Sequence, residues 1–398
     1  MNASTSALPT ATGSTVVRDD VALESLAASE WDALVPGQPL LSHAFLTALH
    51  ASGCASPSTG WRPRYLTAWR GGRLTGAVPL YEKAHSYGEY VFDWAWADAY
   101  RRYGRRYYPK LVGAIPFTPA PGPRIIAGDD DTRQALLTRA LATVRDGDRY
   151  SSLHLLFITE AEAVACAGAG MLIRNGVQFR WENPGYRDFG DFLATFNHDK
   201  RKKVKQDRRK LAEAGVTFSR KTGRDISAAD WAFFYRCYEN TYRAHQSTPY
   251  LSRECFERLG ATMADHLLLV TARRDGVAVC AALDVFDGAT LWGRYWGAIE
   301  YVPGLHFEAC YYQAIEFCIE RGIARFEGGA QGLHKLARGL MPTTTRSAHV
   351  IADPDFEAAI AQFCARERIN VAHTVGELEA AGPFRAGAGN LTERAGKG

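Results

Sequence analysis

The stretch that decides the fold runs from Thr290 to Val350 and reads TLWGRYWGAIEYVPGLHFEACYYQAIEFCIERGIARFEGGAQGLHKLARGLMPTTTRSAHV. Its first part, Leu291 to Gly297, mixes aromatic with small side chains and predicts a β-strand. Residues Ile323 to Glu327 predict a second, short strand that ends in a glycine-rich loop. A helical pattern lies between them. We therefore expect both strands in one sheet, with the helix packed on it.

The helix between these strands carries its own start and stop signals. Pro303 and Gly304 end the first strand, because proline cannot donate to a ladder and glycine permits a tight turn. From His306 to Arg321, apolar residues recur at helical spacing, which is typical of one buried helical face. Gly322 follows where a left-handed C-terminal cap belongs.

Reactive side chains gather around this unit. In strand–helix–strand units, ligands bind at the carboxyl ends of the strands and at the start of the helix. The sequence therefore predicts that one pocket collects His306, Glu308, Gln331, His334 and Lys335. Titratable groups beside exposed backbone N–H groups are what acyl transfer requires, whereas a purely structural domain has little use for them.

Composition limits the class of protein. A chain of 398 residues with 46% hydrophobic and 23% charged residues is globular and long enough for two domains. Its net charge of +4 does not by itself indicate a nucleic-acid partner. The 8 cysteines show no C-x-x-C spacing, so we expect neither a metal site nor a disulfide framework. No apolar run approaches the ~20 residues of a membrane helix, which favours a cytoplasmic protein.

The chain shows a loose internal repeat. A hairpin pattern with its turn at residues 70–73 has a counterpart with its turn at 273–276. Each hairpin is followed by an aromatic-rich segment and then by a helical pattern, at 132–146 or at 306–321.

This repeat predicts two domains of similar architecture. We place the N-terminal domain at 21–185 and the C-terminal domain at 186–379, with a basic helix at 198–211. Residues 1–20 lack the pattern of a signal peptide and are expected to form a disordered tail. Residues 380–398 are rich in Gly and Ala and are expected to form a flexible tail.

Several unusual strings carry a resemblance to a known family. In the second half these are GRYWG at 293–297, LHFEACYY at 305–312 and FEGGAQGLHK at 326–335. In the first half they are SYGEY at 86–90, YYPK at 107–110 and PFTP at 116–119. From about Trp31 to about Phe363, the chain resembles the bacterial predicted N-acyltransferases that are labelled peptidoglycan biosynthesis or recognition proteins. These belong to the GNAT superfamily and are related to Fem-type aminoacyl transferases.

The resemblance implies a fold and a reaction. It implies two tandem GNAT-like α/β domains, each a mixed, mostly antiparallel sheet flanked by helices, and transfer of an acyl group to an amine. It also implies that the strands at 291–297 and 323–327 open a cleft whose backbone holds the donor. The superfamily's phosphate-binding glycine signature is replaced here by PGLH at 303–306. Two donors therefore stay open: acyl-CoA, which is our leading expectation, and the aminoacyl-tRNA of Fem-type relatives. No tightly bound cofactor is expected.

The reaction needs a proton acceptor, since an amine with a pKa of about 10.4 is protonated at neutral pH. Glu308, in the first helical turn, is our first candidate for this base, and Glu327 is the alternative. Both have a structural interpretation. Glu308 can satisfy the N–H groups of the helix start, and Glu327 can pair with Arg325 or Arg294.

Other side chains are expected to assist catalysis or hold the donor. His306 and His334 are expected to titrate near neutral pH, and Tyr312 lies off the apolar stripe, where it can protonate a leaving group. The residues expected to contact the donor are Arg294, Tyr295, Trp296, Gly304, Leu305, Gln331, Lys335 and Arg338. Solvated helix charges are the structural alternative for Lys335 and Arg338.

Two further segments are candidates for substrate contact. From Lys200 to Lys210, 8 of 11 residues are basic, which suits phosphates on CoA, a nucleotide-linked precursor, tRNA or an anionic membrane surface. Residues 87–108 hold 9 aromatic side chains interleaved with carboxylates, a combination that suits a sugar, peptide or amine. The substrate-binding candidates are Tyr87, Glu89, Asp93, Trp96, Tyr107, Lys200, Arg201, Lys203 and His245. Their structural alternatives are core packing, a solvated helix face and, for His245, a helix-end cation.

The sequence thus predicts an N-acyltransferase that acts on a small-molecule, peptide or glycopeptide amine, with no metal. The first alternative is an aminoacyl-tRNA-dependent transferase that acts on a cell-wall-type precursor. The second is a non-catalytic module that binds an anionic ligand or RNA.

Overall fold

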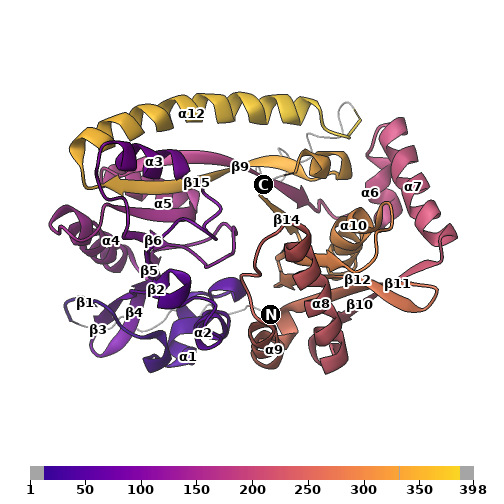
Figure 1. The fold of residues 1–398 in the computed structure, drawn as a ribbon, viewed down its shortest axis with the longest axis horizontal. Coiled ribbons are helices and arrows are strands. Elements are labelled where there is room, and N and C mark those ends of the chain that lie inside the picture. Colours follow the sequence, from indigo (N-terminus) through magenta and orange to yellow (C-terminus); the bar gives the residue numbers. More distant parts are fainter. Residues whose placement is uncertain (1–12, 331, 386–398) are drawn as a thin grey trace, which may run out of the picture.

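A computed structural model describes residues 13–330 and 332–385 of the chain. It shows two α/β lobes side by side, with one long helix lying across both (Figure 1). A sheet of 11 strands runs through both lobes, and a smaller sheet of 4 strands lies in the first lobe. Within these residues, no helix combines the length and the apolar character that crossing a membrane requires.

The large sheet is mixed and mostly antiparallel, as predicted. Its order is β10 (Val216–Thr222), β11 (Leu267–Arg274), β12 (Val277–Phe286), β13 (Thr290–Ala298), β14 (Arg325–Ala330), β9 (Leu172–Glu182), β15 (Met341–Ile351), β8 (Ser152–Ile158), β6 (Lys110–Gly113), β5 (Leu80–Lys83) and β2 (Trp61–Pro63). Among the described strands of this sheet, β13 with β14 and β6 with β8 run parallel, and the other neighbouring pairs run antiparallel. Each lobe therefore contains one parallel pair beside antiparallel neighbours, so the loose repeat of the sequence has a topological counterpart.

The smaller sheet consists of β1 (Val16–Arg18), β3 (Leu66–Arg70), β4 (Arg73–Val78) and β7 (Ile126–Ala127). Strands β3 and β4 form the predicted hairpin of the first half, and β11 and β12 form that of the second. The turns fall at the glycines that the sequence places there, since Gly72 and Gly276 both have positive φ.

The two lobes exchange a strand. Strand β9 comes last in the first half of the chain, yet it pairs with β14 of the second lobe and with β15. Strand β15 comes late in the second half, yet it pairs with β8 of the first lobe. The predicted boundary at 185/186 lies just after β9, so residues 341–351 of the predicted C-terminal domain complete the sheet of the N-terminal lobe.

Helices cover both faces of the sheet. The first lobe contains α1 (Ala28–Leu34), α2 (His43–Ala51), α3 (Trp94–Arg102), α4 (Asp130–Arg145) and α5 (Glu160–Gly168). In the second lobe, α8 (Ala228–Ala244) and α9 (Arg253–Thr262) pack against residues such as Leu283 of β12. The opposite face, with Ala282, is covered by α6 (Phe189–Ala194), α7 (His198–Glu213), α10 (Leu305–Phe307) and α11 (Gln313–Arg321). Alternate residues of one strand thus face two separate cores.

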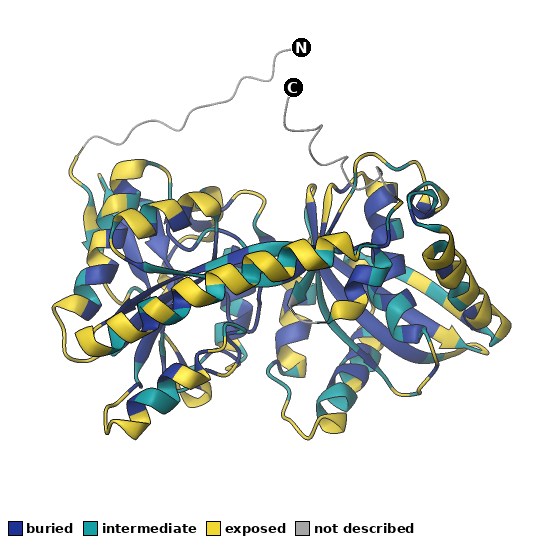
Figure 2. Cartoon of the chain, turned by 90° about the horizontal axis from the view of Figure 1, so that it is seen from above, coloured by how far each residue is buried: buried dark blue, intermediate teal, exposed yellow. Residues whose placement is uncertain are grey.

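The long helix α12 (Pro354–Ala380) joins the lobes from outside. Its 27 residues span about 40 Å at 1.5 Å per residue. Seen from above, it crosses both lobes with an exposed outer face (Figure 2). It packs on β9 and β15, and Glu367 accepts two hydrogen bonds from Arg174 of β9, at 2.6 and 2.9 Å.

The predicted helix at 306–321 is present, but it is not uniform. It starts after Gly304, whose φ is +87°, and ends at Gly322, whose φ is +67°. The predicted start and end of the helix are therefore confirmed. Between α10 and α11 lies a π-helix, η6 (Glu308–Tyr312). Nothing in the sequence predicts this wider turn. Such turns are rare in proteins as a whole, but where they occur they are frequently at functional sites.

Candidate active site

The parallel strands β13 and β14 part at their carboxyl ends. Their ladder joins Thr290 to Arg325, Leu291 to Phe326 and Trp292 to Glu327, and then stops. Strand β13 continues to Ala298 and β14 to Ala330. Backbone groups beyond the last pair have no partner in the other strand, so a ligand can meet them there. The strands thus diverge at the place where the family resemblance implies a donor-binding cleft.

A β-bulge marks the same place on β13. The register with β12 shifts between Tyr295 and Gly293, which leaves Arg294 as the extra residue. Bulges re-aim side chains beside functional sites. Here Arg294 reaches the first lobe, where its Nη2 donates to the carbonyl of Phe117 at 2.7 Å and to Oγ1 of Thr118 at 3.0 Å. The bulge therefore ties β13 to a loop of the other lobe.

A buried carboxyl that sequence reasoning missed lies beside this bulge. Asp284 of β12 is 2% exposed, and the backbone N–H of Arg294 donates to it. Burial raises the pKa of Asp284 well above its usual value, which favours the neutral acid. The sequence feature that could have pointed to Asp284 is an acidic residue within the otherwise apolar run VAVCAALDVF.

Glu308, the first predicted base, is held by the basic helix α7. Its Oε1 lies 2.9 Å from Nη2 of Arg208 and accepts a hydrogen bond from Gln313 at 2.8 Å. Burial raises the pKa of Glu308, although the Arg208 guanidinium opposes this shift. Arg208 also binds Glu316 at 2.8 Å. These contacts anchor α7 to the helix that starts at the opening.

Glu327, the alternative base, is also buried and paired. Its Oε1 lies 2.7 Å from Nε of Arg180 on β9, and burial raises its pKa. The ion pair of the structural interpretation is therefore present, but its close partner is Arg180 rather than Arg325 or Arg294. That pairing could not be foreseen, because it depends on β9 being next to β14.

The two predicted histidines lie together in an aromatic cluster. The ring of His306 is 4.6 Å from that of Trp296 and 5.7 Å from that of His334. Nε2 of His334 lies 3.0 Å from the hydroxyl of Tyr311. Burial, with nearby cations, lowers the pKa of His306 to about 4 and also lowers that of His334. His306 therefore does not titrate near neutral pH, contrary to the expectation, and the pKa of His334 is shifted in the same direction.

Two predicted cations line the segment that follows β14. Lys335 is buried, its Nζ donates to the carbonyl of Gly329 at 3.2 Å, and burial lowers its pKa to about 8. The guanidinium of Arg338 lies 3.6 Å above the ring of Phe307, and its Nη1 donates to the carbonyl of His334 at 2.8 Å. The predicted residue Gln331 lies outside the described residues.

The remaining donor-site candidates divide between the two faces of the sheet. Trp296 packs on the side of Leu305, which is buried directly after Gly304. Tyr295 faces the other core, where its ring is 5.5 Å from that of Tyr238. One surface therefore cannot hold all the predicted contacts. Tyr312 is buried against Phe189, and burial raises its pKa to about 12, so it stays protonated.

The predicted acceptor surface of the first lobe is largely a buried network, which corrects the prediction. Glu89, Asp93, Trp96 and Tyr107 are at most 4% exposed, whereas Tyr87 is 58% exposed. The aromatic side chains pack around these charged groups. The charged groups can be buried there because they form ion pairs and hydrogen bonds with one another.

Lys110 is the centre of this network. Its Nζ donates to Glu89 at 2.8 Å and to Asp93, and the hydroxyl of Tyr107 donates to Asp93 at 2.6 Å. Burial raises the pKa of Glu89 to about 7. Burial also acts to raise the pKa of Asp93, but the Lys110 ammonium and the hydrogen bonds from Lys110 and Ser86 bring it down to about 2.

Two histidines that the sequence did not single out continue the network. His154 of β8 and His349 of β15 face each other with their Nδ1 atoms 2.6 Å apart. Ser347 lies 2.8 Å from Nε2 of His349. Burial lowers the pKa of both histidines, that of His154 to about 3, so both are neutral. The exchanged strand β15 is thus bonded to the interior of the first lobe.

The basic helix forms over the predicted residues. In α7, Val204 and Leu211 are buried, while Lys200 and Lys203 are exposed and Arg201 is partly exposed. Nδ1 of His245 lies 2.7 Å from the carbonyl of Thr241 at the exposed end of α8, which matches its structural interpretation.

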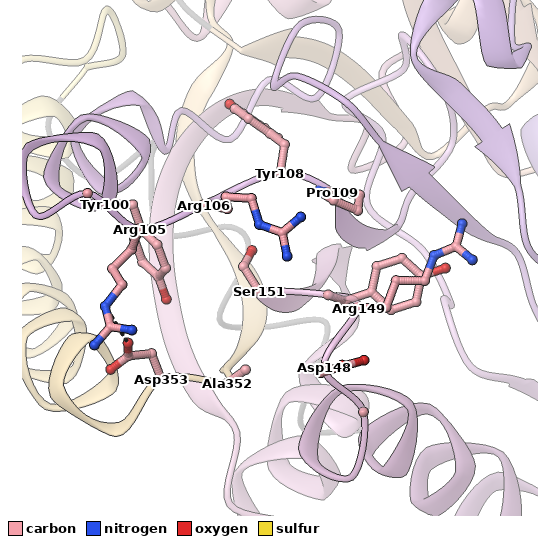
Figure 3. Close-up of a pocket in the computed structure, with 13 residues that line it drawn as sticks. Tyr100, Arg105, Arg106, Tyr108, Pro109, Asp148, Arg149, Ser151, Ala352 and Asp353 are labelled. Carbon is pink, nitrogen blue, oxygen red and sulfur yellow. Dashed lines mark ion pairs between the residues drawn. The ribbon is translucent and has the colours of Figure 1, made fainter.

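Cavities also open on the surface of the described part of the chain. One, of about 360 Å³, lies at the amino ends of β6 and β8, where Arg106 points between Pro109 and Ser151 and Arg105 pairs with Asp353 (Figure 3). Another, of about 220 Å³, lies along β9 and β15 and is lined by residues including Tyr90, Phe157, Gln178 and Ser347. Within residues 13–330 and 332–385, no cluster of His, Cys, Asp and Glu has the arrangement of a metal site.

Comparison with known proteins gives a family and a fold. Residues 22–386 match the model of the FemAB-like family, described as peptidoglycan biosynthesis/recognition. FemX is 12% identical, with 86% of this chain and 99% of that chain covered and a TM-score of 0.53. L-PGS from Bacillus licheniformis is 10% identical, with 83% of this chain and 96% of that chain covered and a TM-score of 0.48.

A tandem GNAT protein from the clavulanic acid biosynthesis pathway is 12% identical, with 86% and 99% covered and a TM-score of 0.42. No curated protein sequence matches the chain. The likeness to FemX confirms the predicted α/β fold of two lobes, each with a mixed, mostly antiparallel sheet flanked by helices. Since the family model spans nearly all the described residues, the chain belongs to the FemAB-like family of peptidoglycan biosynthesis/recognition proteins.

Proposed function

We propose that this protein transfers an acyl or aminoacyl group from an activated carrier to an amine of a peptidoglycan-type precursor. The observation that carries the proposal is the parting of β13 and β14 directly beyond Trp292 and Glu327. Unpaired backbone donors at that point can bind the carbonyl of a donor, and Lys335 follows on the next segment. The FemAB-like family supports the peptidoglycan context.

The chemistry requires a base and a group that stabilises the oxyanion. Glu327 is the better placed of the two predicted bases, because it occupies the last paired position before the strands part. Its raised pKa makes it a stronger proton acceptor than an ordinary carboxylate. Lys335, buried at the same end of β14, is the proposed cation for the developing negative charge.

The acceptor is proposed to enter through the cavity that lies along the paired strands β9 and β15. Gln178 lines this cavity and is also the residue of β9 that lies opposite Ala330 of β14. Its Nε2 donates to the carbonyl of Pro119, in the same loop that Arg294 binds. An amine held beside Gln178 would therefore approach the end of β14.

Acyl-CoA is the leading donor, and aminoacyl-tRNA is the second candidate. The second is favoured by α7, which presents exposed lysines to solvent and is joined through Arg208 to Glu308, near the start of the helix at the opening. Lysines in this arrangement suit the repeated phosphates of a nucleic acid. An exposed basic helix also suits the pyrophosphate of CoA, and the assay below separates the two donors.

The test is a transfer assay with purified protein and a UDP-linked peptidoglycan precursor as acceptor. Acetyl-CoA, longer acyl-CoAs and aminoacyl-tRNA are supplied in separate reactions, and the acceptor is followed by mass spectrometry. We expect one donor class to add its acyl group. We further expect Glu327→Gln and Lys335→Met to abolish most transfer, while the control Lys221→Met, in a partly exposed ion pair with Asp230, retains it.

The non-catalytic alternative makes a different prediction in the same experiment. A binding module would be stabilised thermally by a donor or by the precursor, by ~2.7 kcal/mol at a hundred times the dissociation constant, without any transfer. The Glu327 and Lys335 variants would then keep this stabilisation. Absence of transfer from every donor, with binding retained, would overturn the proposed reaction.

A further inference from the structure

The cavity of about 220 Å³ along β9 and β15 contains a serine that the proposed transfer does not use. Ser347 lies opposite Arg174 in the ladder between these strands, whereas Gln178 lies opposite Thr343. Residues 174 and 178 of one strand are about 13 Å apart, at ~3.3 Å per residue. The Ser347 end of the cavity is therefore distinct from the Gln178 end, which lies beside β14.

A continuous chain of hydrogen bonds runs from Ser347 into the first lobe. The hydroxyl of Ser347 lies 2.8 Å from Nε2 of His349, and the Nδ1 atoms of His349 and His154 are 2.6 Å apart. Nε2 of His154 lies 3.4 Å from the hydroxyl of Tyr107, which donates to Asp93 at 2.6 Å. The chain joins a hydroxyl at the cavity to a buried carboxylate.

The far end of this chain sets the direction of its protons. Asp93 is an ion-paired carboxylate and can only accept hydrogen bonds. The single proton of Tyr107 goes to Asp93, so Nε2 of His154 donates toward the oxygen of Tyr107. Nδ1 of His154 then accepts from Nδ1 of His349. Nε2 of His349 is left to accept from the hydroxyl of Ser347.

Ser152 agrees with this direction. Its oxygen lies 2.7 Å from Nε2 of His154 and 3.2 Å from Oγ of Ser151, whose own proton goes to the carbonyl of Tyr107. Ser152 can therefore donate to Ser151 and accept from His154. In this arrangement His154 carries its proton on Nε2 and His349 carries its proton on Nδ1.

The chain can move a proton away from the cavity without charging either ring. Burial lowers the pKa of His154 and of His349, so neither ring alone is a good base. Each ring can instead take a proton on one nitrogen while it releases one from the other. Asp93 shares Lys110 with Glu89, and burial raises the pKa of Glu89 to about 7. This cluster can therefore take up a proton close to neutral pH.

The walls of the cavity suit an acyl group. The aromatic side chains of Tyr90, Phe92 and Phe157 line it. Tyr90 and Phe157 have φ values of +61° and +57°, in the left-handed region that side chains of this size rarely adopt. Backbone strain of this kind gathers at active sites and ligand clamps. Arg174, held by Glu367, provides a positive charge at the Ser347 end.

The other end of the cavity has a free acceptor. Gln178 is 1% exposed, and among the described residues nothing donates to its Oε1. A buried acceptor without a partner is costly, so it indicates a place where a ligand donates a hydrogen bond. A ligand that reaches from Ser347 to Gln178 would carry an N–H or O–H group about 13 Å from its reacting carbonyl.

We propose that Ser347 is a nucleophile that takes up an acyl group from an activated ester or thioester in this cavity, so that the protein has a second, esterase-type site. The oxygen of Ser347 attacks the carbonyl carbon, and a C–O bond forms. The serine proton passes to Nε2 of His349, and one proton moves at each later member of the chain until Asp93 is protonated. Arg174 is the cation available to the developing oxyanion.

The remaining steps reverse the movement of the proton. The bond from the carbonyl carbon to the leaving oxygen or sulfur breaks, and the proton returns along the chain to that atom, which leaves as an alcohol or a thiol. Water then attacks the acyl-serine and gives its proton to His349. The C–O bond to Ser347 breaks, the proton returns to the serine oxygen, and a carboxylic acid leaves. This inference does not rest on the proposed transfer to an amine, because it requires no amine acceptor and no residue of the opening between β13 and β14.

Labelling of the wild-type chain tests the nucleophile. The full-length protein is treated with phenylmethanesulfonyl fluoride or with p-nitrophenyl acetate, and the adducts are mapped by mass spectrometry. We expect a sulfonyl or acetyl group on Ser347. We also expect a burst of about one p-nitrophenol per chain, followed by slower turnover, as an acyl-enzyme gives. An unmodified Ser347 with both reagents would overturn the proposal.

Variants test the relay. Ser347→Ala should lose the adduct and the burst. His349→Gln keeps an acceptor for the serine hydroxyl but cannot pass a proton on, so labelling of Ser347 should slow about 10²-fold or more. The matched control is Thr344→Ala, which removes a hydroxyl from the same strand but from its other face, and it should react like the wild type. Equal labelling rates in His349→Gln and the wild type would contradict the relay.

Nuclear magnetic resonance of the wild-type chain tests the direction of the protons without any variant. In protein made with nitrogen-labelled histidine, we expect neutral rings, with the proton of His154 on Nε2 and that of His349 on Nδ1. A purely structural network allows either direction. The opposite pair of tautomers would overturn the relay, and the labelling of wild-type Ser347 decides the nucleophile even if a variant fails to fold.

Discussion

Replacing Lys110 by methionine tests the buried network of the first lobe. Methionine keeps most of the volume of the lysine stem but removes the ammonium that bonds Glu89 and Asp93. Those carboxylates are 3% and 3% exposed, so water cannot replace the lost contacts. Removing one partner of a buried ion pair leaves an uncompensated charge and costs about 3–5 kcal/mol. We expect Lys110→Met to lose free energy of unfolding in this range at pH 7.

The loss of unfolding free energy in Lys110→Met should become smaller in acid. Without Lys110 the folded-state pKa of Glu89, which is about 7 and already above its unfolded value, rises further, and that of Asp93 rises from about 2. The folded variant then binds more protons than its unfolded chain, so its stability is fully present below the unfolded pKa values and is lost as pH rises through the folded ones. The difference from wild type should therefore shrink between pH 7 and pH 5.

Urea unfolding followed by circular dichroism measures both effects. The matched control is Lys221→Met, whose ion pair with Asp230 is partly exposed and should contribute at most about 1 kcal/mol. The double variant Lys110→Met/Asp93→Asn should be less destabilised than the sum of the single variants, because one buried charge is gone. A loss below about 1 kcal/mol, or one that does not shrink in acid, would refute the reasoning.

Three further predictions concern the second lobe. Lys335→Met should lower kcat for acyl transfer about 10²-fold, the usual effect of losing an oxyanion stabiliser, with little change in melting temperature, measured by steady-state kinetics and calorimetry. Arg208→Met should leave the buried Glu308 without its ion-pair partner and lower the free energy of unfolding by about 3 kcal/mol. The exposed control Arg209→Met should not lower it. Urea unfolding midpoints measure both effects. Acid should destabilise the lobe as pH falls from 6.5 to 4, because the folded pKa of His306 is depressed to about 4 and the unfolded chain binds the extra proton. His306→Phe should remove up to about 3 kcal/mol of that pH dependence, and an unchanged acid profile would contradict the burial of this ring.

Local signals in the sequence predict the elements well. Apolar spacing from 306 to 321 and the glycines at both ends locate one helix, and turn residues locate two hairpins. These features depend on neighbours along the chain. The π-helix could not be predicted in this way, because a single wider turn leaves the apolar face of the helix intact.

The parts that could not be predicted depend on distant segments. Glu308 and Glu327 were candidates for the base, but their arginine partners come from α7 and β9. Glu89 and Asp93 were expected at a surface, because charged residues are rarely buried unless they are paired. Their common partner Lys110 lies in a separate strand, so the pairing becomes visible only when the sheet is assembled.

The exchanged strand β15 has a consequence for synthesis on the ribosome. The edge of β8 has no antiparallel neighbour until residues 341–351 have been made, and His154 has no His349 to face. At ~5–20 residues per second, roughly 10–40 s pass between translation of Ile158 and translation of Ile351. During that time an open strand edge can pair with other chains. The first lobe, although made first, is therefore among the last parts of the molecule to be completed, and a nascent chain needs protection at β8 until its end is translated.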